Sequence, residues 1–107
     1  MYLGSNPAAY ANRRQIIALM AASKIPAIYF QTAFVTDGGL ISYATNFPDL
    51  ARRSAVYADK ILRGAKPADL PIERPTRLDL SINLKTAQAL GLVIPQSLLL
   101  RATEMIE

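Results

Sequence analysis

The spacing of hydrophobic residues along the chain predicts helices that alternate with strands. Residues 12–24 carry apolar side chains every three to four positions, which is typical of a helix, with Asn12 at the N-cap position. Residues 26–30 form a short apolar run, as expected of a parallel strand covered on both faces. Residues 32–36 predict one or two helical turns, and the Asp37-Gly38-Gly39 turn separates them from a second strand at 40–44.

The middle of the chain predicts one long helix followed by an extended segment. An apolar stripe runs at helical spacing through 48–63, with Pro48 in the first turn and Gly64 just after the last. Within 65–77, three prolines recur at four-residue intervals, which disfavours a helix and favours an extended chain: Pro67, Pro71 and Pro75. We expect this stretch to be a crossing segment.

The last third of the chain predicts a strand and two further helices. Apolar and polar residues alternate strictly over 78–83, which predicts a strand with one face in water. Asn83 is placed to cap a helix that ends at Gly91. Pro95 is placed to begin a final helix whose apolar positions are Leu98, Leu99, Ala102, Met105 and Ile106. This order predicts an α/β fold with a largely parallel sheet flanked by helices.

Composition narrows the classes of protein that fit. The chain has 107 residues, of which 51% are hydrophobic and 19% charged, so we expect one folded domain and no intrinsic disorder. It contains no cysteine and no histidine, which excludes disulfides, zinc fingers, thiol nucleophiles and Ser-His-Asp catalysis. Carboxylate, lysine and tyrosine chemistry remain open, and we expect no metal and no cofactor.

The beginning of the chain carries no secretion signal that we recognise. Residues 1–10 lack both a basic and an apolar region of a signal peptide, and no window approaches the roughly 20 apolar residues of a membrane-spanning helix. We expect a soluble chain. Met1 to Gly4 is typical of the end of a strand whose beginning is missing, which suggests a start in the middle of a larger fold.

The charge pattern argues against two further functions. A formal net charge of +4 is compatible with nucleic-acid binding, but Lys and Arg alternate with Asp and Glu as on a solvated surface. Asp79 lies on the polar face of its predicted strand and Asp37 and Asp49 lie at loop or helix starts, and no spacing pairs them for acid-base catalysis. We therefore expect neither nucleic-acid binding nor an enzyme.

Residues at predicted strand ends are the candidates for a binding site. Open α/β sheets bind ligands at the carboxyl ends of their strands. Ser5 and Asn6 follow strand-like residues, whereas Tyr29, Phe30 and Tyr43 end two predicted strands. Most aromatic residues in this region pack in a core, so a cleft role and a core role both remain open.

Several segments together resemble one protein family. They closely resemble the C-terminal end of the ABC-transporter substrate-binding family, in the same order and at similar spacing: Arg13 to Ile16, Ile25 to Tyr29, Gly38 to Tyr43, Lys60 to Thr76, Ile82 to Leu92 and Ile94 to Leu99. The resemblance covers essentially the whole chain.

The resemblance implies a longer, two-lobed parent protein. Members have the type-I periplasmic binding fold, deliver a small solute to an ABC permease, and include binders of aromatic amino acids. Residues 1–107 then form the C-terminal portion, with about 40–44 and 65–77 as the segments that cross between lobes. The resemblance also implies a periplasmic or cell-surface location for the parent.

By position in the family, the solute cleft is lined by six residues: Ser5, Asn6, Tyr29, Phe30, Ser42 and Tyr43. In the same arrangement, the helix at 48–63 packs on the first lobe. Without that lobe its apolar stripe has no partner, so we expect this chain to form a homo-oligomer. The rival hypothesis is a self-associating fragment that binds no solute of its own.

Overall fold

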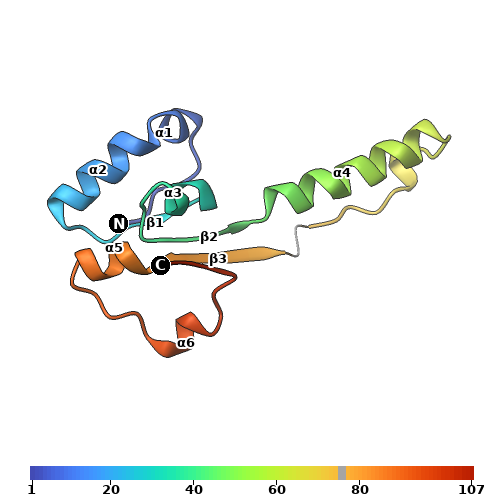
Figure 1. Cartoon of the computed structure of the whole chain (residues 1–107). Coiled ribbons are helices and arrows are strands. Elements are labelled where there is room, and N and C mark those ends of the chain that lie inside the picture. Colours follow the sequence, from blue (N-terminus) through green and yellow to red (C-terminus); the bar gives the residue numbers. More distant parts are fainter. Residues whose placement is uncertain (75–76) are drawn as a thin grey trace. The chain divides into compact units, whose positions relative to one another are not determined.

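The computed structural model describes residues 1–74 and 77–107. Figure 1 shows the order of its elements along the chain. The helices are α1 (Pro7–Ala11), α2 (Arg13–Ser23), α3 (Thr32–Thr36), α4 (Phe47–Leu62), α5 (Leu84–Ala89) and α6 (Gln96–Leu99), with a 3-10 turn at Pro67–Asp69. The strands are β1 (Ile28–Tyr29), β2 (Ile41–Thr45), β3 (Leu78–Asn83) and β4 (Glu104–Ile106).

The chain divides into two compact units. We call Met1–Ala44 together with Asp79–Glu107 the core unit, and Thr45–Leu78 the helical unit. The core unit contains the hydrophobic core, whose centre is formed by Ile17, Ala27, Tyr29 and Phe34. In the helical unit, α4 buries none of its residues fully.

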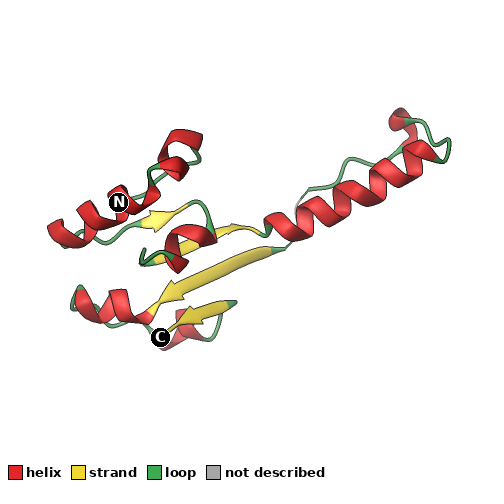
Figure 2. Cartoon of the chain, turned by 45° about the horizontal axis from the view of Figure 1, so that its top comes forward, coloured by secondary structure: helices red, strands yellow, loops and turns green. Residues whose placement is uncertain are grey.

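The four strands form one sheet in the order β1-β2-β3-β4. β1 is parallel to β2, and β3 is parallel to β4. In the core unit the Asn83 backbone N–H donates to the Leu40 carbonyl, and in the helical unit Asn46 donates to Arg77 in the same way. This pattern makes β2 and β3 antiparallel, as their arrows in Figure 2 show. The predicted α/β class with a mostly parallel sheet is confirmed.

An additional strand-like segment lies beside β1. Tyr2 bridges Ile28 in parallel, and the Leu3 N–H donates to the Ile28 carbonyl at 2.9 Å. The Met1 ammonium donates to the Pro26 carbonyl at 2.7 Å. The strand-like character predicted for Met1 to Gly4 is thus present at Tyr2.

Helix starts follow the local chemistry of the sequence. Asn46 caps α4 by accepting a bond from the Asp49 N–H at 2.8 Å, and Asn83 caps α5 through the Thr86 N–H at 3.1 Å. Gly64 follows α4 with φ of 108°, as predicted for the residue after a helix. Asn12 differs from its predicted role, because its side-chain amide donates to the Ala8 carbonyl and makes no cap bond to α2.

Three further predictions about local structure are wrong. The final helix is short, because the chain turns after α6 and residues 104–106 pair with β3 as strand β4. The predicted extended stretch contains the 3-10 turn at Pro67–Asp69, since proline suits the first position of such a turn. Pro75, which also lies in that stretch, is outside the described residues.

The third error concerns the polar face of β3, which we predicted to be in water. Ser81 is fully buried and Asn83 is 5% exposed. Asn83 donates its amide to the Val35 carbonyl at 3.2 Å, and the Ser81 hydroxyl lies 3.4 Å from that of Thr32. Helix α3 covers this face, and these hydrogen bonds offset the cost of burying its polar groups.

Candidate functional site

The carboxyl ends of the segment at Tyr2 and of β1 lie beside the middle of β2 in the core unit. Tyr2 pairs with Ile28, Ile28 with Ile41, and Tyr29 with Ser42. In this register Leu3 lies level with Tyr29 and Ser42, and the next residues along the three segments are Gly4, Phe30 and Tyr43. This edge is where an open α/β sheet binds its ligands, so it is the candidate site.

The predicted residues at this edge differ in exposure. Tyr43 is 61% exposed, because its side chain projects from the sheet face opposite to buried Ser42 and Ala44. Ser5 is exposed in the turn before α1, and Phe30 is half-buried against the core. These three side chains combine position at the edge with exposed surface that a solute can contact.

The other predicted residues have structural partners. The Asn6 side chain caps α1 by accepting a bond from the Ala8 N–H at 2.8 Å. Tyr29 is 1% exposed and stacks on Phe34 with ring centroids 4.9 Å apart. Burial raises the pKa of the Tyr29 phenol above its usual 10.0, so this side chain is neutral at physiological pH. Their assignment to a solute site stays a prediction.

The surroundings of Ser42 differ most from what is expected of a residue that lines a solute cleft. It is fully buried, and among the residues that the structure describes its hydroxyl has no hydrogen-bond partner. The antiparallel register of β2 and β3 places it opposite Ser81, whose hydroxyl neighbours that of Thr32. Sequence reasoning placed Ser42 at this edge but missed the two neighbouring hydroxyl groups, because they come from distant segments.

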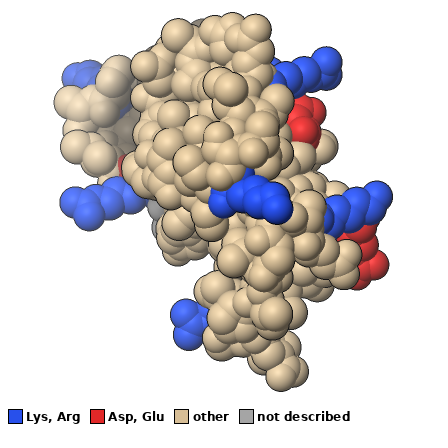
Figure 3. All heavy atoms as spheres, turned by 90° about the vertical axis from the view of Figure 1, so that its left-hand side faces the viewer, with Lys and Arg blue, Asp and Glu red and all other residues tan. Residues whose placement is uncertain are grey.

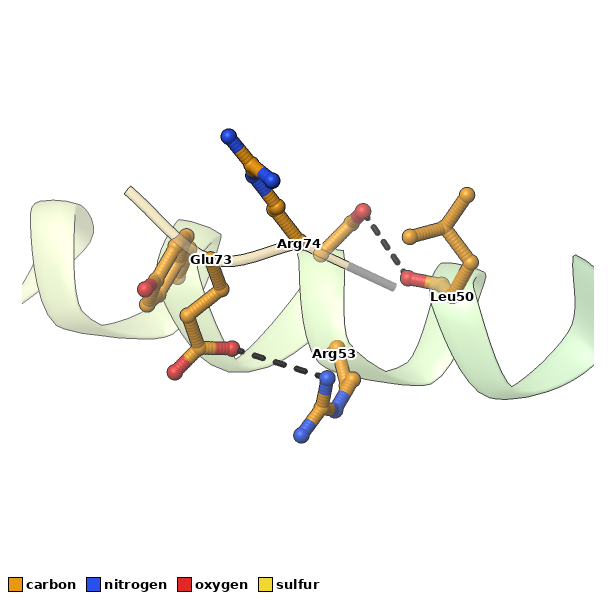
Figure 4. Close-up of a pocket in the computed structure, with 6 residues that line it drawn as sticks. Leu50, Arg53, Glu73 and Arg74 are labelled. Atoms are coloured by element: carbon orange, nitrogen blue, oxygen red, sulfur yellow. Dashed lines mark hydrogen bonds and ion pairs between the residues drawn. The ribbon is translucent and has the colours of Figure 1, made fainter. Parts of the chain in front are cut away.

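A separate pocket of about 170 Å³ lies within the helical unit. Figure 4 shows that it lies between α4 and the segment 70–74, which we call the return segment. The Arg53 guanidinium lies 3.9 Å from the Glu73 carboxylate, and the Tyr57 hydroxyl donates to the Pro71 carbonyl at 2.6 Å. Desolvation, with the Glu73 charge, raises the pKa of Tyr57. Ligand pockets usually have a volume of at least about 300 Å³, so this pocket is small for a ligand. The contacts around it mainly hold the return segment against α4.

Charge and metal chemistry add no further site. On the face shown in Figure 3, Lys and Arg side chains stand apart, some of them beside Asp or Glu, and do not form one continuous patch. Among residues 1–74 and 77–107, no cluster of acidic residues is arranged to hold a metal ion. Within the same residues, no helix has the length and hydrophobicity needed to cross a membrane.

Comparison with known proteins identifies the family. The family described as ABC transporter substrate binding protein matches residues 6–106. A solved structure of the ABC domain in complex with L-Trp from Streptococcus pneumonia is 31% identical, with a TM-score of 0.87 over 98% of this chain. A conserved domain protein from Vibrio cholerae O1 biovar El Tor is 27% identical, with a TM-score of 0.88 over 97% of this chain.

The chain spans only 36% and 35% of the length of those two solved chains. The ligand-free, open structure of a substrate-binding protein with adhesive properties from Clostridium difficile is 22% identical with a TM-score of 0.69, which supports the fold. A comparison with curated proteins gave no match. The family match covers nearly the whole chain and confirms the resemblance. This chain therefore belongs to the ABC transporter substrate-binding protein family.

Proposed function

We propose that this chain forms part of the solute-binding component of an ABC importer and supplies one wall of an inter-lobe cleft. The observation that carries this proposal is the partly exposed surface of Ser5, Phe30 and Tyr43, beside the point where β1 ends against β2. Family membership supports solute binding, and the function needs no catalysis. Delivery of the solute to a permease, from a periplasmic or cell-surface location, belongs to the same proposal.

The proposed solute is an amino acid, with aromatic amino acids first. A solved relative at 31% identity is described in complex with L-Trp. The candidate edge offers exposed aromatic surface at Tyr43 and half-buried surface at Phe30, which suit a planar apolar side chain. In this proposal, the six predicted residues contact the solute or support those that do, and the chain crosses between lobes at about 40–44 and 65–77.

The test is a calorimetric titration of L-tryptophan, L-tyrosine and L-leucine into a two-lobed protein that contains residues 1–107. Tyr43→Ala is expected to weaken binding about tenfold or more, since it removes an exposed aromatic contact, and to change stability little because the side chain is 61% exposed. Leu19→Ala, which removes another large exposed side chain, on α2, is the matched control. Unchanged affinity in Tyr43→Ala would remove Tyr43 from the site.

A second candidate function is self-association without solute binding. The observation that favours it is the set of large exposed apolar side chains on α4, which includes Phe47 at 48% and Leu62 at 87% exposure. Titration of the 107-residue chain alone separates the two candidates. Solute binding by this chain as a monomer would contradict the second, whereas an oligomer that binds none of the three amino acids would favour it.

A further inference from the structure

Asp79 places a carboxylate beside the end of β1. In the core unit the antiparallel register of β2 and β3 pairs Ser42 with Ser81. Two residues further along, on the same face of the sheet, Ala44 lies opposite Asp79. Tyr29 is the last residue of β1 and lies level with Ser42, so Asp79 lies just past the point where β1 stops. The carboxylate therefore belongs to the candidate edge, on the sheet face that α3 covers.

Three hydroxyl groups belong to the same face of the sheet or to α3, which covers it. The Ser81 hydroxyl donates to the Thr32 hydroxyl at 3.4 Å. Ser42 is fully buried, and its hydroxyl has no hydrogen-bond partner among the described residues. A buried hydroxyl without a partner costs stability, so its presence points to a partner that arrives with a ligand. Asp79 and Thr32 are partly exposed, which leaves both within reach of a solute.

We infer that Asp79 and Thr32 bind the ammonium group of an amino-acid solute. Ser42 and Ser81 lie beneath them as positioning residues. The inference rests on the proposed function and names the side chains that recognise one group of its solute. None of the six residues predicted to line the cleft is charged, so those six offer the ammonium group no ion pair. Asp79 supplies the negative charge at the same edge.

The early end of β1 allows one solute to reach both this carboxylate and the aromatic residues. Beyond Ser42, β2 continues to Thr45, whereas β1 has already ended. A solute in line with β1 therefore borders β2, with Tyr43 on one face of the sheet and Asp79 on the other. On the second face the side chain between the solute and Asp79 is Ala44, whose methyl group is too small to keep them apart.

The hydrogen-bonding capacity of these side chains matches an ammonium group. Such a group carries a positive charge and only donors, so its best partners are a carboxylate and hydroxyl oxygens. The Thr32 oxygen can accept two hydrogen bonds, of which Ser81 supplies one. In the complex we expect Thr32 to accept the second from the ammonium group and to donate its own proton to Ser42. Ser42 then gains the partner that its buried hydroxyl lacks among the described residues.

The test uses calorimetric titration of a two-lobed protein that contains residues 1–107. The amino acid that binds most tightly among L-tryptophan, L-tyrosine and L-leucine is compared with the acid that lacks its amino group, which for L-tryptophan is indolepropionate. Asp79→Asn is expected to weaken binding of the amino acid about tenfold or more and to change the affinity for the deaminated acid less than about threefold. Asp69→Asn removes the same charge from an exposed residue of the 3-10 turn and is expected to change neither affinity.

Substitutions of the hydroxyl residues separate a role in recognition from a role in folding. Thr32→Val removes the hydroxyl but keeps the shape, and it is expected to weaken the amino acid alone, whereas Thr32→Ser keeps the hydroxyl and the affinity. Ser42→Ala removes a buried hydroxyl that has no partner among the described residues. The free Ser42→Ala protein is therefore expected to be at least as stable as wild type in thermal unfolding and still to bind the amino acid more weakly.

The outcomes distinguish this inference from the proposed function. If the wild type binds the amino acid but Asp79→Asn weakens both ligands equally, or neither, the inference is overturned and the proposed function stands. Equal affinity of the wild type for the amino acid and its deaminated acid also overturns the inference alone, because the ammonium group then contributes nothing. If the wild type binds none of the three amino acids, the proposed amino-acid solute is wrong and the inference fails with it.

Discussion

The core unit and the helical unit are stabilised in different ways. In the core unit, Tyr29, Phe34, Val35 and Ile82 are each at most 1% exposed, and two aromatic rings meet Phe34 about 5 Å from its centre. In the helical unit, α4 relies on its Asn46 cap and on ion pairs such as Arg63 with Asp59. Burial of apolar surface contributes far more to stability than exposed ion pairs do. The difference indicates that the core unit carries most of the folding free energy.

The largest expected effect tests this difference directly. Phe34→Ala removes a fully buried ring that contacts Tyr10, Tyr29 and Phe30, and it is expected to lower the free energy of unfolding by about 3–5 kcal/mol. Leu62→Ala on α4, 87% exposed, is expected to change it by less than about 0.5 kcal/mol in dilute solution. Urea unfolding followed by circular dichroism measures both. Similar losses in the two variants would contradict the comparison.

Substitution of one glycine in each unit tests the same difference between the core unit and the helical unit, because close packing requires Gly39 and a positive φ requires Gly64. A Cβ atom on Gly39 would lie 2.7 Å from the Tyr29 ring and 2.8 Å from the Phe34 carbonyl. Gly39→Ala is therefore expected to cost roughly 1–3 kcal/mol by overpacking the core unit. Gly64 in the helical unit has φ of 108°, and a Cβ atom there would have no neighbour within 4 Å among the described residues, so Gly64→Ala costs about 1–2 kcal/mol through backbone strain alone.

Asparagine substitutions separate these two causes. Asn tolerates positive φ better than Ala but is larger. Gly64→Asn is thus expected to be more stable than Gly64→Ala, whereas Gly39→Asn is expected to be less stable than Gly39→Ala. Thermal unfolding of the four variants gives the order. If Asn is the better residue at both positions, steric contact is not what selects Gly39.

The same division explains what could be predicted from the sequence. Periodicity predicted α2, α3 and the first three strands, and periodicity together with capping residues predicted α4 and α5, because these depend on neighbours along the chain. Strand β4 was missed, since residues 104–106 become a strand through pairing with the distant residues 81–83. The burial of Ser81 and Asn83 was missed for the same reason, because the partners that permit it come from α3.

For the candidate site, the sequence predicted where residues lie along the strands better than it predicted their side-chain contacts. Predicted strand ends placed Ser5, Phe30 and Tyr43 at one edge of the sheet. The pairing of Tyr29 with Ser42 makes Phe30 and Tyr43 neighbours, although β2 continues to Thr45, and the role of the three residues in a solute site stays a prediction. The packing of Tyr29 on Phe34 depends on how α3 covers the sheet, and the burial of Ser42, whose hydroxyl has no partner among the described residues, depends on the tertiary fold. Spacing along the chain contains no information about such tertiary contacts.

The smallest expected effect concerns the pH dependence of the helical unit. A hydrogen bond from Arg52, with the nearby charges of Arg53 and Arg77, lowers the pKa of Asp49 below its usual 3.8 in spite of partial desolvation. The unfolded chain therefore binds more protons than the folded chain as acid is added through this range. The stabilisation is complete above pH 3.8 and is lost as the pH falls through the lowered pKa of the folded state. The α4 helix is expected to lose part of its stability in strong acid, whereas Asp49→Asn is less stable at neutral pH and shows a flatter pH profile.

Arg52→Gln, which removes the main cause of the lowered Asp49 pKa, is expected to flatten the pH profile of stability in the same way. Thermal unfolding followed by circular dichroism at several pH values measures this, and parallel profiles for wild type and Asp49→Asn would show that Asp49 does not link protonation to stability. Phe34→Ala leaves Asp49 and its partners in place, so it should retain the pH dependence of the helical unit while losing stability in the core unit.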